Sequence, residues 1–302
     1  MGNYNYLSVI TTVYNRCDRL KALYDSLDSQ TVKDFRWIVV DDGSTDDIAG
    51  VVKEIKDQKP EFDFVYVRKE NGGKHTALNK AFGMLGDNEL VINVDSDDYL
   101  VKDTIETILS DWSRYGSDEV CGLCYKKMNK DGKSVCDDFG KDAQVANYNN
   151  FIINGGINGD KAEVFRADIL SKQRFPEYDG ENFLGEGVMW SKMAHDYDMV
   201  FINKAIYVCE YLEDGLTKSG REMRIKNPRG GMHHAEEYLE KRYKLPVRMK
   251  NALLYLTYAR FAKISIVDIC KKSSYKCLLF ANLIPSFMLY KYWGGKYGGK
   301  ND

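Results

Sequence analysis

A short acidic run is the strongest candidate for chemistry in this chain. Asp95 and Asp97 stand two residues apart, directly after the apolar segment 90–94. Carboxylates at the end of a buried strand carry a high desolvation cost, which a divalent cation relieves. Hard oxygen ligands suit Mg²⁺ or Mn²⁺, and such an ion fills its shell with diphosphate oxygens when the protein supplies few ligands. Asp95 and Asp97 are therefore the predicted metal ligands of a DXD motif, where a metal could act as a Lewis acid on a departing diphosphate.

The elements that position these carboxylates follow from the apolar pattern of the first hundred residues. Apolar runs of strand length alternate with segments whose apolar residues recur at helical intervals. The predicted strands are 7–13, 35–40, 62–67 and 90–94, and the predicted helices are 17–30, 46–57 and 72–85, with Ser44 as N-cap of the second helix. Near-continuous apolar strands joined by helices predict an α/β fold with a parallel sheet covered on both faces.

A polar cluster follows each predicted strand. Asn15 comes after the first strand, residues 41–44 after the second, 70–74 after the third and 95–98 after the fourth. In open parallel sheets, ligands bind beyond the carboxyl ends of the strands, because loops and helix N-termini converge there. The sequence therefore predicts one site built from all four clusters.

The same four segments resemble the family 2 glycosyltransferases of GT-A fold. The resemblance rests on Thr11-Thr12-Val13-Tyr14-Asn15-Arg16, Val40-Asp41-Asp42-Gly43-Ser44-Thr45-Asp46, Glu70-Asn71-Gly72-Gly73 with Ala77-Leu78-Asn79, and Val94-Asp95-Ser96-Asp97-Asp98, in the family's order and spacing. It implies a Rossmann-like mixed sheet with helices on both faces. It also implies an inverting, hexosyltransferase-type transfer from a nucleotide-sugar, most often a UDP-sugar, to an acceptor hydroxyl, with Mn²⁺ or Mg²⁺ as cofactor.

The resemblance also assigns roles in the donor site. Tyr14 would stack on the donor, Asp42 would accept from the base N–H, and Lys74, beside a helix N-terminus, would meet base or phosphate. Asp95 would hold the ribose or the metal. The residues assigned to the nucleotide-sugar are Thr12, Tyr14, Asn15, Asp42, Gly73, Lys74, Asn79, Asp95 and Ser96. As alternatives, Asp42 could shape the Gly43 turn and Thr12 could be a core residue.

Inverting transfer needs a general base that takes the proton from the acceptor hydroxyl. The family usually supplies it as the Asp of a Glu-Asp pair that opens a helix in the second half of the chain. Here the corresponding segment places Gly187 where that Asp would stand. Glu186 is therefore the predicted base and Glu181 the second choice. Alternatively, both are helix N-terminal charges favoured by the dipole.

The second half of the chain has a less regular pattern. It predicts a strand at 119–128, a loop-rich stretch at 147–159, a helix at 184–195, a strand at 198–209 and a polar loop at 212–231. Lys218, Arg221, Arg224 and Arg229 in that loop could close over the diphosphate, or form a solvated charge run. His233 and His234 could add a third metal ligand. The predicted domains are a catalytic domain 1–230, with a donor half at about 1–100 and an acceptor half at about 101–230, and a C-terminal helical region 231–302.

The C-terminal region predicts helices from 233 to 293, broken near Ser273-Ser274 and at Pro285. The run 277–290 is apolar, shorter than a membrane span, interrupted by Asn282 and Pro285, and flanked by lysines. That layout suits a helix lying in a membrane interface. The alternative is packing onto the catalytic domain or onto a second subunit in a homodimer.

Composition excludes some classes of protein. A net charge of -2 over 302 residues argues against a nucleic-acid binder. Seven irregularly spaced cysteines fit a reducing cytoplasm, and the N-terminus lacks a signal-peptide layout. By analogy we expect a bacterial enzyme, peripheral on the inner membrane face, that uses a glycan or lipid-linked acceptor in polysaccharide or glycolipid biosynthesis.

Three other functions compete with this interpretation. A sugar nucleotidyltransferase would need a glycine-rich N-terminal loop, and a dinucleotide-binding dehydrogenase would need G-x-G-x-x-G after the first strand; the sequence has neither. The third is a catalytically inactive subunit that binds the nucleotide-sugar and positions a partner through its C-terminal helices, and Gly187 is its best support. The sequence leaves open which sugar is moved and which acceptor receives it.

Overall fold

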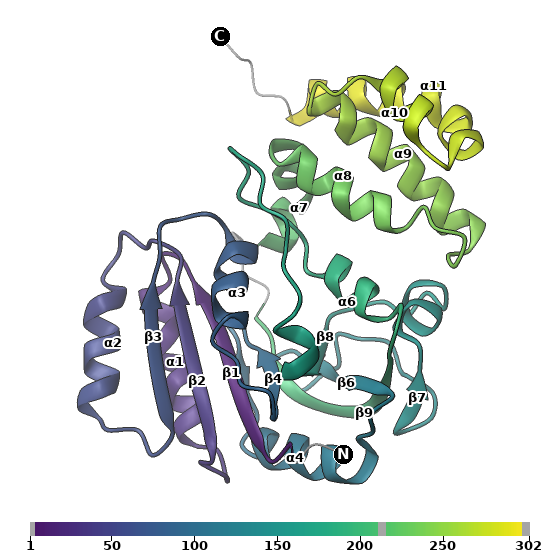
Figure 1. Ribbon diagram of the computed structural model, residues 1–302. Helices are drawn as coiled ribbons and strands as arrows, with labels where there is room; N and C mark the ends of the chain where they lie inside the picture. Colours follow the sequence, from purple (N-terminus) through teal and green to yellow (C-terminus); the bar gives the residue numbers. More distant parts are fainter. Residues whose placement is uncertain (1–3, 211–215, 298–302) are drawn as a thin grey trace. The chain divides into compact units, whose positions relative to one another are not determined.

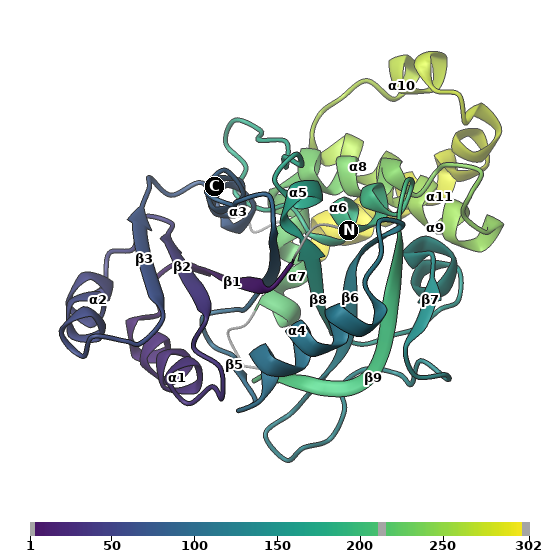
Figure 2. The ribbon, with the colours of Figure 1, turned by 60° about the horizontal axis from the view of Figure 1, so that its bottom comes forward.

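The computed structural model describes residues 4–210 and 216–297 (Figures 1 and 2). It forms two compact units. The first comprises Met1–Phe175 and Met193–Glu210, and the second comprises Pro176–Lys192 and Tyr211–Asp302.

The first unit is built on one mixed sheet. Its parallel part has the order β3-β2-β1-β4, with β1 (Tyr6–Val13), β2 (Phe35–Asp41), β3 (Asp63–Arg68) and β4 (Glu89–Asn93). The sheet continues through β8 (Lys161–Arg166), β6 (Val120–Met128), β9 (Asp198–Val208) and β5 (Tyr99–Leu100), and β7 (Gln144–Ala146) pairs with β9. Among these, β8 is antiparallel to both neighbours while β6 and β9 run parallel. The predicted α/β class is confirmed.

Helices cover both faces of the sheet, as predicted. Leu7, Val9 and Val13 of β1 share a core with α1 (Cys17–Asp28), α2 (Ile48–Asp57) and α4 (Thr104–Tyr115). Alternate residues point to the other face, where α3 (Lys74–Phe82) packs on β1 and β2. Short segments complete this unit: α5 (Ala167–Leu170) beside β4 and β8, and the π-helical turn η1 (Asn149–Ile153). All four predicted strands are confirmed.

One helix start differs from its prediction. α2 begins at Ile48, and its N-cap is Asp47, which accepts from the Gly50 N–H at 3.1 Å. Ser44 was the wrong choice because it belongs to the turn after β2. Its N–H donates to Asp41 at 2.7 Å, and its hydroxyl accepts from the Asn15 N–H at 3.0 Å.

The second unit is helical. It contains most of α6 (Gly187–Met193), then α7 (Leu216–Lys226), α8 (Pro228–Glu237), α9 (Leu245–Phe261), α10 (Ile266–Lys272) and α11 (Lys276–Tyr297). The predicted polar loop 212–231 is wrong from residue 216 onward, because Ile225 of α7 and Met232 of α8 join an apolar cluster with α9. Residues 212–215 of that prediction lie outside the described residues.

The predicted C-terminal helices are largely confirmed. The break near Ser273-Ser274 exists, but the break at Pro285 is wrong, since α11 runs through it. Pro285 and Ala281, whose carbonyl loses its helical partner, are both exposed, so water can satisfy that carbonyl. Within residues 4–210 and 216–297, no helix is long and apolar enough to cross a membrane.

Candidate functional site

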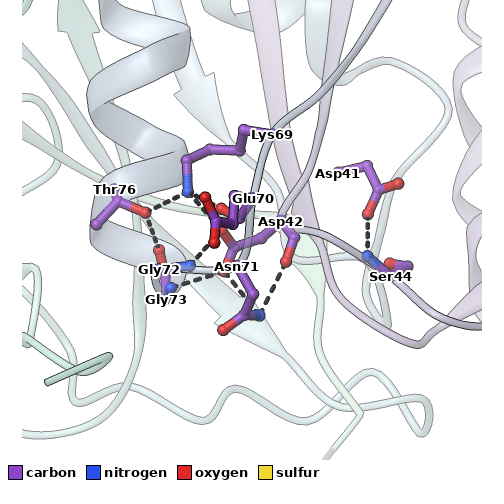
Figure 3. A network of polar contacts seen from close by, with 9 residues as sticks. All are labelled: Asp41, Asp42, Ser44, Lys69, Glu70, Asn71, Gly72, Gly73 and Thr76. Carbon is purple, nitrogen blue, oxygen red and sulfur yellow. Dashed lines mark hydrogen bonds and ion pairs between the residues drawn. The ribbon is translucent and has the colours of Figure 1, made fainter. Parts of the chain in front are cut away.

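Asp42 lies at the centre of a closed polar network (Figure 3). One oxygen of this buried carboxylate accepts from the Lys69 ammonium at 2.8 Å and the Gly72 N–H at 3.1 Å. The other accepts from the Gly73 N–H at 2.7 Å and the Asn71 amide at 3.3 Å. A carboxylate offers about four acceptor positions, so all are in use. The contact of Asp42 with a nucleotide base stays a prediction. It requires that one of the present donors leaves, such as the Asn71 amide, whose hydrogen bond is the longest of the four at 3.3 Å.

Two glycines let these loops approach each other. Gly43 has φ +79°, and a Cβ there would lie 2.7 Å from the Asn71 nitrogen. Gly73 has φ +91° and is the N-cap of α3. Only glycine adopts such backbone angles without steric cost. The network therefore fixes the start of α3 beside the end of β2.

The residues after β1 join the same edge of the sheet. Asn15 has φ 51°, and its side-chain oxygen accepts from the Thr45 N–H at 2.7 Å. Asn15 thus ties the β1 loop to the β2 loop. Thr12 is buried, whereas Tyr14 is 49% exposed. A half-exposed ring at the end of β1 is suited to stacking on a flat ligand.

Lys74 and Asp95 meet at the carboxyl end of β4. The Lys74 ammonium, from the first residue of α3, donates to an Asp95 carboxylate oxygen at 2.6 Å. Burial by itself raises the pKa of Asp95, but the Lys74 and Lys127 ammonium groups outweigh it and hold the pKa at about 2. Asp95 is therefore ionised at neutral pH.

Asp97 completes an acidic pair with Asp95. Burial, followed by the charge of Asp95, raises the pKa of Asp97. The cost of ionising both carboxylates is the kind that a divalent cation removes, and the donor set is hard oxygen. These residues therefore fit Mg²⁺ or Mn²⁺. Ser96 lies buried between them.

Asp98, the next residue in the sequence, supports the backbone of the acidic motif. The buried Tyr207 hydroxyl donates to one Asp98 oxygen at 2.8 Å and accepts from the Asp95 N–H at 2.9 Å. The Glu210 N–H donates to the other oxygen at 2.9 Å. The Lys127 ammonium lies 3.7 Å from the centroid of the Tyr207 ring and 3.9 Å from Asp98. These contacts fix the backbone that presents Asp95 and Asp97.

Sequence reasoning missed Lys69, Lys127 and Tyr207. Lys127 gave a weak signal, since a lysine at the end of an apolar strand must find a counter-charge or reach solvent. Tyr207 gave none, because its partner Asp98 is 109 residues away.

Asn79 has a backbone partner on each side of its amide. Its nitrogen donates to the Phe175 carbonyl at 2.9 Å, and its oxygen accepts from the Phe175 N–H at 2.8 Å. This pair attaches α3 to the segment after α5. A role for Asn79 in binding a nucleotide-sugar stays a prediction.

The two predicted bases belong to the second unit. Glu181 accepts from the N–H groups of Arg229 and Gly230, both at 2.8 Å, and so caps the first turn of α8. Glu186 is half-buried and directly precedes α6. A Cβ at Gly187 would have its nearest neighbours, in His234 and Tyr238, at 3.9 Å, so the position has room for a Cβ atom.

The arginines predicted to close over the diphosphate and the histidine predicted as a metal ligand have neighbours within the second unit. Arg221 lies over the Trp293 ring and Arg224 over the Phe183 ring, at 5.3 and 5.5 Å from the centroids. The His233 Nε2 atom lies 3.0 Å from an ammonium, that of Lys192. The side chain of Lys218 lies outside the described residues. Their roles in binding diphosphate or metal stay predictions.

Comparison with known proteins gives a consistent picture. The family model "Glycosyl transferase family 2" matches residues 8–172. A GalNAc(5)-diNAcBac-PP-undecaprenol beta-1,3-glucosyltransferase of Campylobacter jejuni is 26% identical over 220 residues, which are 70% of this chain and 67% of that protein. Glycosyltransferase GlyA of Streptococcus pneumoniae is 32% identical over 126 residues, which are 42% of this chain but only 18% of that protein.

Solved structures share the fold. S. aureus TarS 1-349 in complex with UDP-GlcNAc has a TM-score of 0.63 and 21% identity, covering 93% of this chain and 80% of that one. The mannosyltransferase PcManGT from Pyrobaculum calidifontis, in complex with GDP-Man and Mn²⁺, has a TM-score of 0.56 and 16% identity, covering 97% and 83%.

Proposed function

The chain belongs to glycosyl transferase family 2 and has the GT-A fold, and from that premise we propose that it moves a sugar from a UDP-sugar to an acceptor hydroxyl with inversion. The observation that carries the proposal is the pair Asp95 and Asp97 at the carboxyl end of β4, with Lys74 held against Asp95 at 2.6 Å. A cationic side chain, a helix start and two carboxylates at one place suit a metal-bound diphosphate.

We assign the donor site to the strand ends of the first unit. Tyr14, half exposed after β1, stacks on the base, and Thr12 lies at the end of the same strand. Asp42 and Gly73 hold the loop that starts α3, so Lys74 meets the donor from a fixed position. Asn15 and Asn79 bond to the backbone of Thr45 and Phe175, and Ser96 is the buried residue between Asp95 and Asp97 in the sequence. The support from elsewhere is the UDP-GlcNAc bound to TarS.

We propose Asp95 and Asp97 as the residues that hold Mn²⁺ or Mg²⁺. When bound, the ion would neutralise charge on the leaving diphosphate as a Lewis acid. Lys74 would share that task through its ammonium group. The Mn²⁺ bound to PcManGT supports a metal in this fold.

We propose Glu186 as the general base that takes the proton from the acceptor hydroxyl as its oxygen attacks the anomeric carbon. Glu181 is less suited, because backbone N–H groups of α8 already occupy both of its oxygens. The missing side chain at Gly187 favours one alternative, a subunit that binds the donor without consuming it.

For the acceptor we propose a glycan or a lipid-linked glycan used in cell-surface polysaccharide or glycolipid synthesis. The name of the Campylobacter relative, which acts on an undecaprenol-linked acceptor, supports this class. We place the reaction in the cytoplasm at the inner face of a bacterial membrane, where such an acceptor would be presented.

Calorimetry tests the donor site. A panel of nucleotide-sugars is titrated with and without Mn²⁺ into the wild-type chain, Asp97→Ala and the control Asp57→Asn, which changes an exposed carboxylate paired with Lys53. We expect one UDP-sugar to bind only with metal, and Asp97→Ala alone to lose that binding. No metal-dependent binding of any donor would refute the proposal.

Turnover with a pool of acceptors tests the base. Glu186→Gln should retain donor binding and lose about 10²–10⁴-fold in transfer, the usual contribution of general base catalysis. Donor that binds to the wild-type chain but is never consumed would favour the inactive subunit.

A further inference from the structure

The last helix, α11, carries an exposed apolar face. Phe280, Ile284, Phe287, Met288 and Tyr292 are between 48% and 72% exposed. Their spacing of three and four residues places them on one side of the helix. With a helical rise of about 1.5 Å per residue, this face is roughly 18 Å long along the helix axis.

The opposite side of α11 is already packed. Leu279 and Ser286 are fully buried, Trp293 is 5% exposed, and the helix packs along α9 (Figure 1). Leu279 and Trp293 join Leu256 and Ala259 of α9 in one apolar cluster. A helix that is apolar on all sides is normally buried all round. The exposed face of α11 therefore calls for a second partner.

The size of this face is that of an interaction site. Five large side chains that are each about 60% exposed present on the order of 600 Å² of surface, if each contributes about 200 Å² when fully exposed. The largest apolar patch on a typical monomer is roughly 300–600 Å², and patches of that size are often functional.

Positive charge surrounds the face. From residue 269 to residue 301 the sequence contains six lysines and no aspartate or glutamate. Lys276, Lys291 and Lys296 of α11 are exposed. The Lys291 ammonium and the Arg260 guanidinium lie 5.7 and 5.5 Å from the centroid of the Phe287 ring, so cations border the apolar surface directly.

We propose that the exposed face of α11 docks onto an anionic lipid bilayer. The helix lies along the membrane surface, because its other side stays packed on α9. Phe280, Ile284 and Met288 enter the boundary between headgroups and acyl chains, and the lysines contact lipid phosphates. Apolar burial combined with attraction to anionic headgroups is the usual basis of interfacial helix binding.

A second copy of the chain is a poorer occupant. A stable protein interface buries about 800 Å² on each partner, more than this face offers. In a two-fold symmetric dimer the same patch meets itself, which would bring the lysines of both copies together without an acidic partner from residues 269–301.

Vesicle sedimentation tests this proposal on the full chain, without any need for sugar transfer. The vesicles are phosphatidylcholine alone, or phosphatidylcholine with one third phosphatidylglycerol, at about 0.1 M and about 0.5 M salt. The variants are Ile284→Asp/Met288→Asp on the exposed face and Lys276→Gln/Lys291→Gln/Lys296→Gln beside it. The control is Val145→Asp, which changes a 56% exposed apolar residue on β7.

We expect the wild type and the control to bind anionic vesicles roughly tenfold better than neutral ones, less so in high salt. Both α11 variants should bind roughly tenfold more weakly, with unchanged circular dichroism because the substituted residues are exposed. Absence of binding to anionic vesicles, or equal binding by the Ile284→Asp/Met288→Asp variant, would overturn the proposal. So would a concentration-dependent dimer of the wild type that this variant abolishes, since the face would then belong to a second copy.

Discussion

Replacing Tyr207 by phenylalanine removes one hydroxyl from the support of the acidic motif. That hydroxyl donates to Asp98 at 2.8 Å and accepts from the Asp95 N–H at 2.9 Å, and the side chain is fully buried. A hydrogen bond to a charged group contributes about 1.5–3 kcal/mol and one between neutral groups about 1 kcal/mol. Tyr207→Phe should therefore lower the free energy of unfolding by roughly 2–4 kcal/mol.

The same substitution should also weaken metal-dependent nucleotide binding. Without the hydroxyl, the Asp95 backbone loses its anchor to β9, and the two carboxylates are held less firmly in the geometry that a metal requires. We expect a loss of roughly tenfold or more in the affinity for UDP with Mn²⁺, because small displacements of a preorganised site are costly.

Tyr125→Phe is the matched control. Tyr125 is also fully buried, and its hydroxyl donates to a carboxylate, that of Asp111, at 3.0 Å. This variant should lose stability, by about the one charged hydrogen bond, and keep its nucleotide affinity. Urea unfolding followed by tryptophan fluorescence and calorimetry with UDP and Mn²⁺ supply the two readouts. Equal losses of affinity in both variants would refute the reasoning, since the effect of Tyr207 would then be a general loosening of the sheet.

Three further predictions concern stability, each measured by urea unfolding. Gly43→Ala should lower the free energy of unfolding by at least about 2 kcal/mol, because the new Cβ would meet the Asn71 backbone nitrogen at 2.7 Å. The control Gly132→Ala has a similar positive φ but open space around the Cβ, and it should lower the free energy by about 1 kcal/mol. Equal losses in the two variants would contradict this reasoning. Burial and then Arg224 lower the pKa of His234 to about 4, so the folded protein binds fewer protons than the unfolded chain between pH 4 and 6.5. As the pH drops through that window, this histidine should lower the free energy of unfolding by about 2–3 kcal/mol, and His234→Gln should reduce that loss. If the variant and the wild type have the same dependence of stability on pH, the prediction is wrong. Pro285→Ala should stabilise the chain by about 1–3 kcal/mol by restoring a helical hydrogen bond, and a loss of stability would show that the proline is needed.

Much of the first unit could be predicted from the sequence. The four parallel strands and their order along the chain follow from local apolar runs, and the polar residues after them follow from the rule that ligands bind at strand ends. The sequence predicts that Asp95 and Lys74 both belong to the donor site, and the structure places the Lys74 ammonium 2.6 Å from an Asp95 carboxylate oxygen. The errors were local choices that packing reversed. Ser44 lies in the turn after β2, and Asp47 is the cap of α2. Helix α7 occupies a segment whose polar residues indicate a loop.

The α/β class, the family and the acidic motif can all be predicted from the sequence, because those features depend on residue types at short spacing. The support of the motif is visible only in the folded chain, since Tyr207 and Asp98 are 109 residues apart and meet through the pairing of β5 with β9. The same is true of the capping of α8 by Glu181 and of α11, where one face is packed and the other is exposed. Such outcomes depend on which surfaces are brought together when the chain folds. The local sequence around an apolar or charged residue does not reveal whether that residue will contact solvent or another helix.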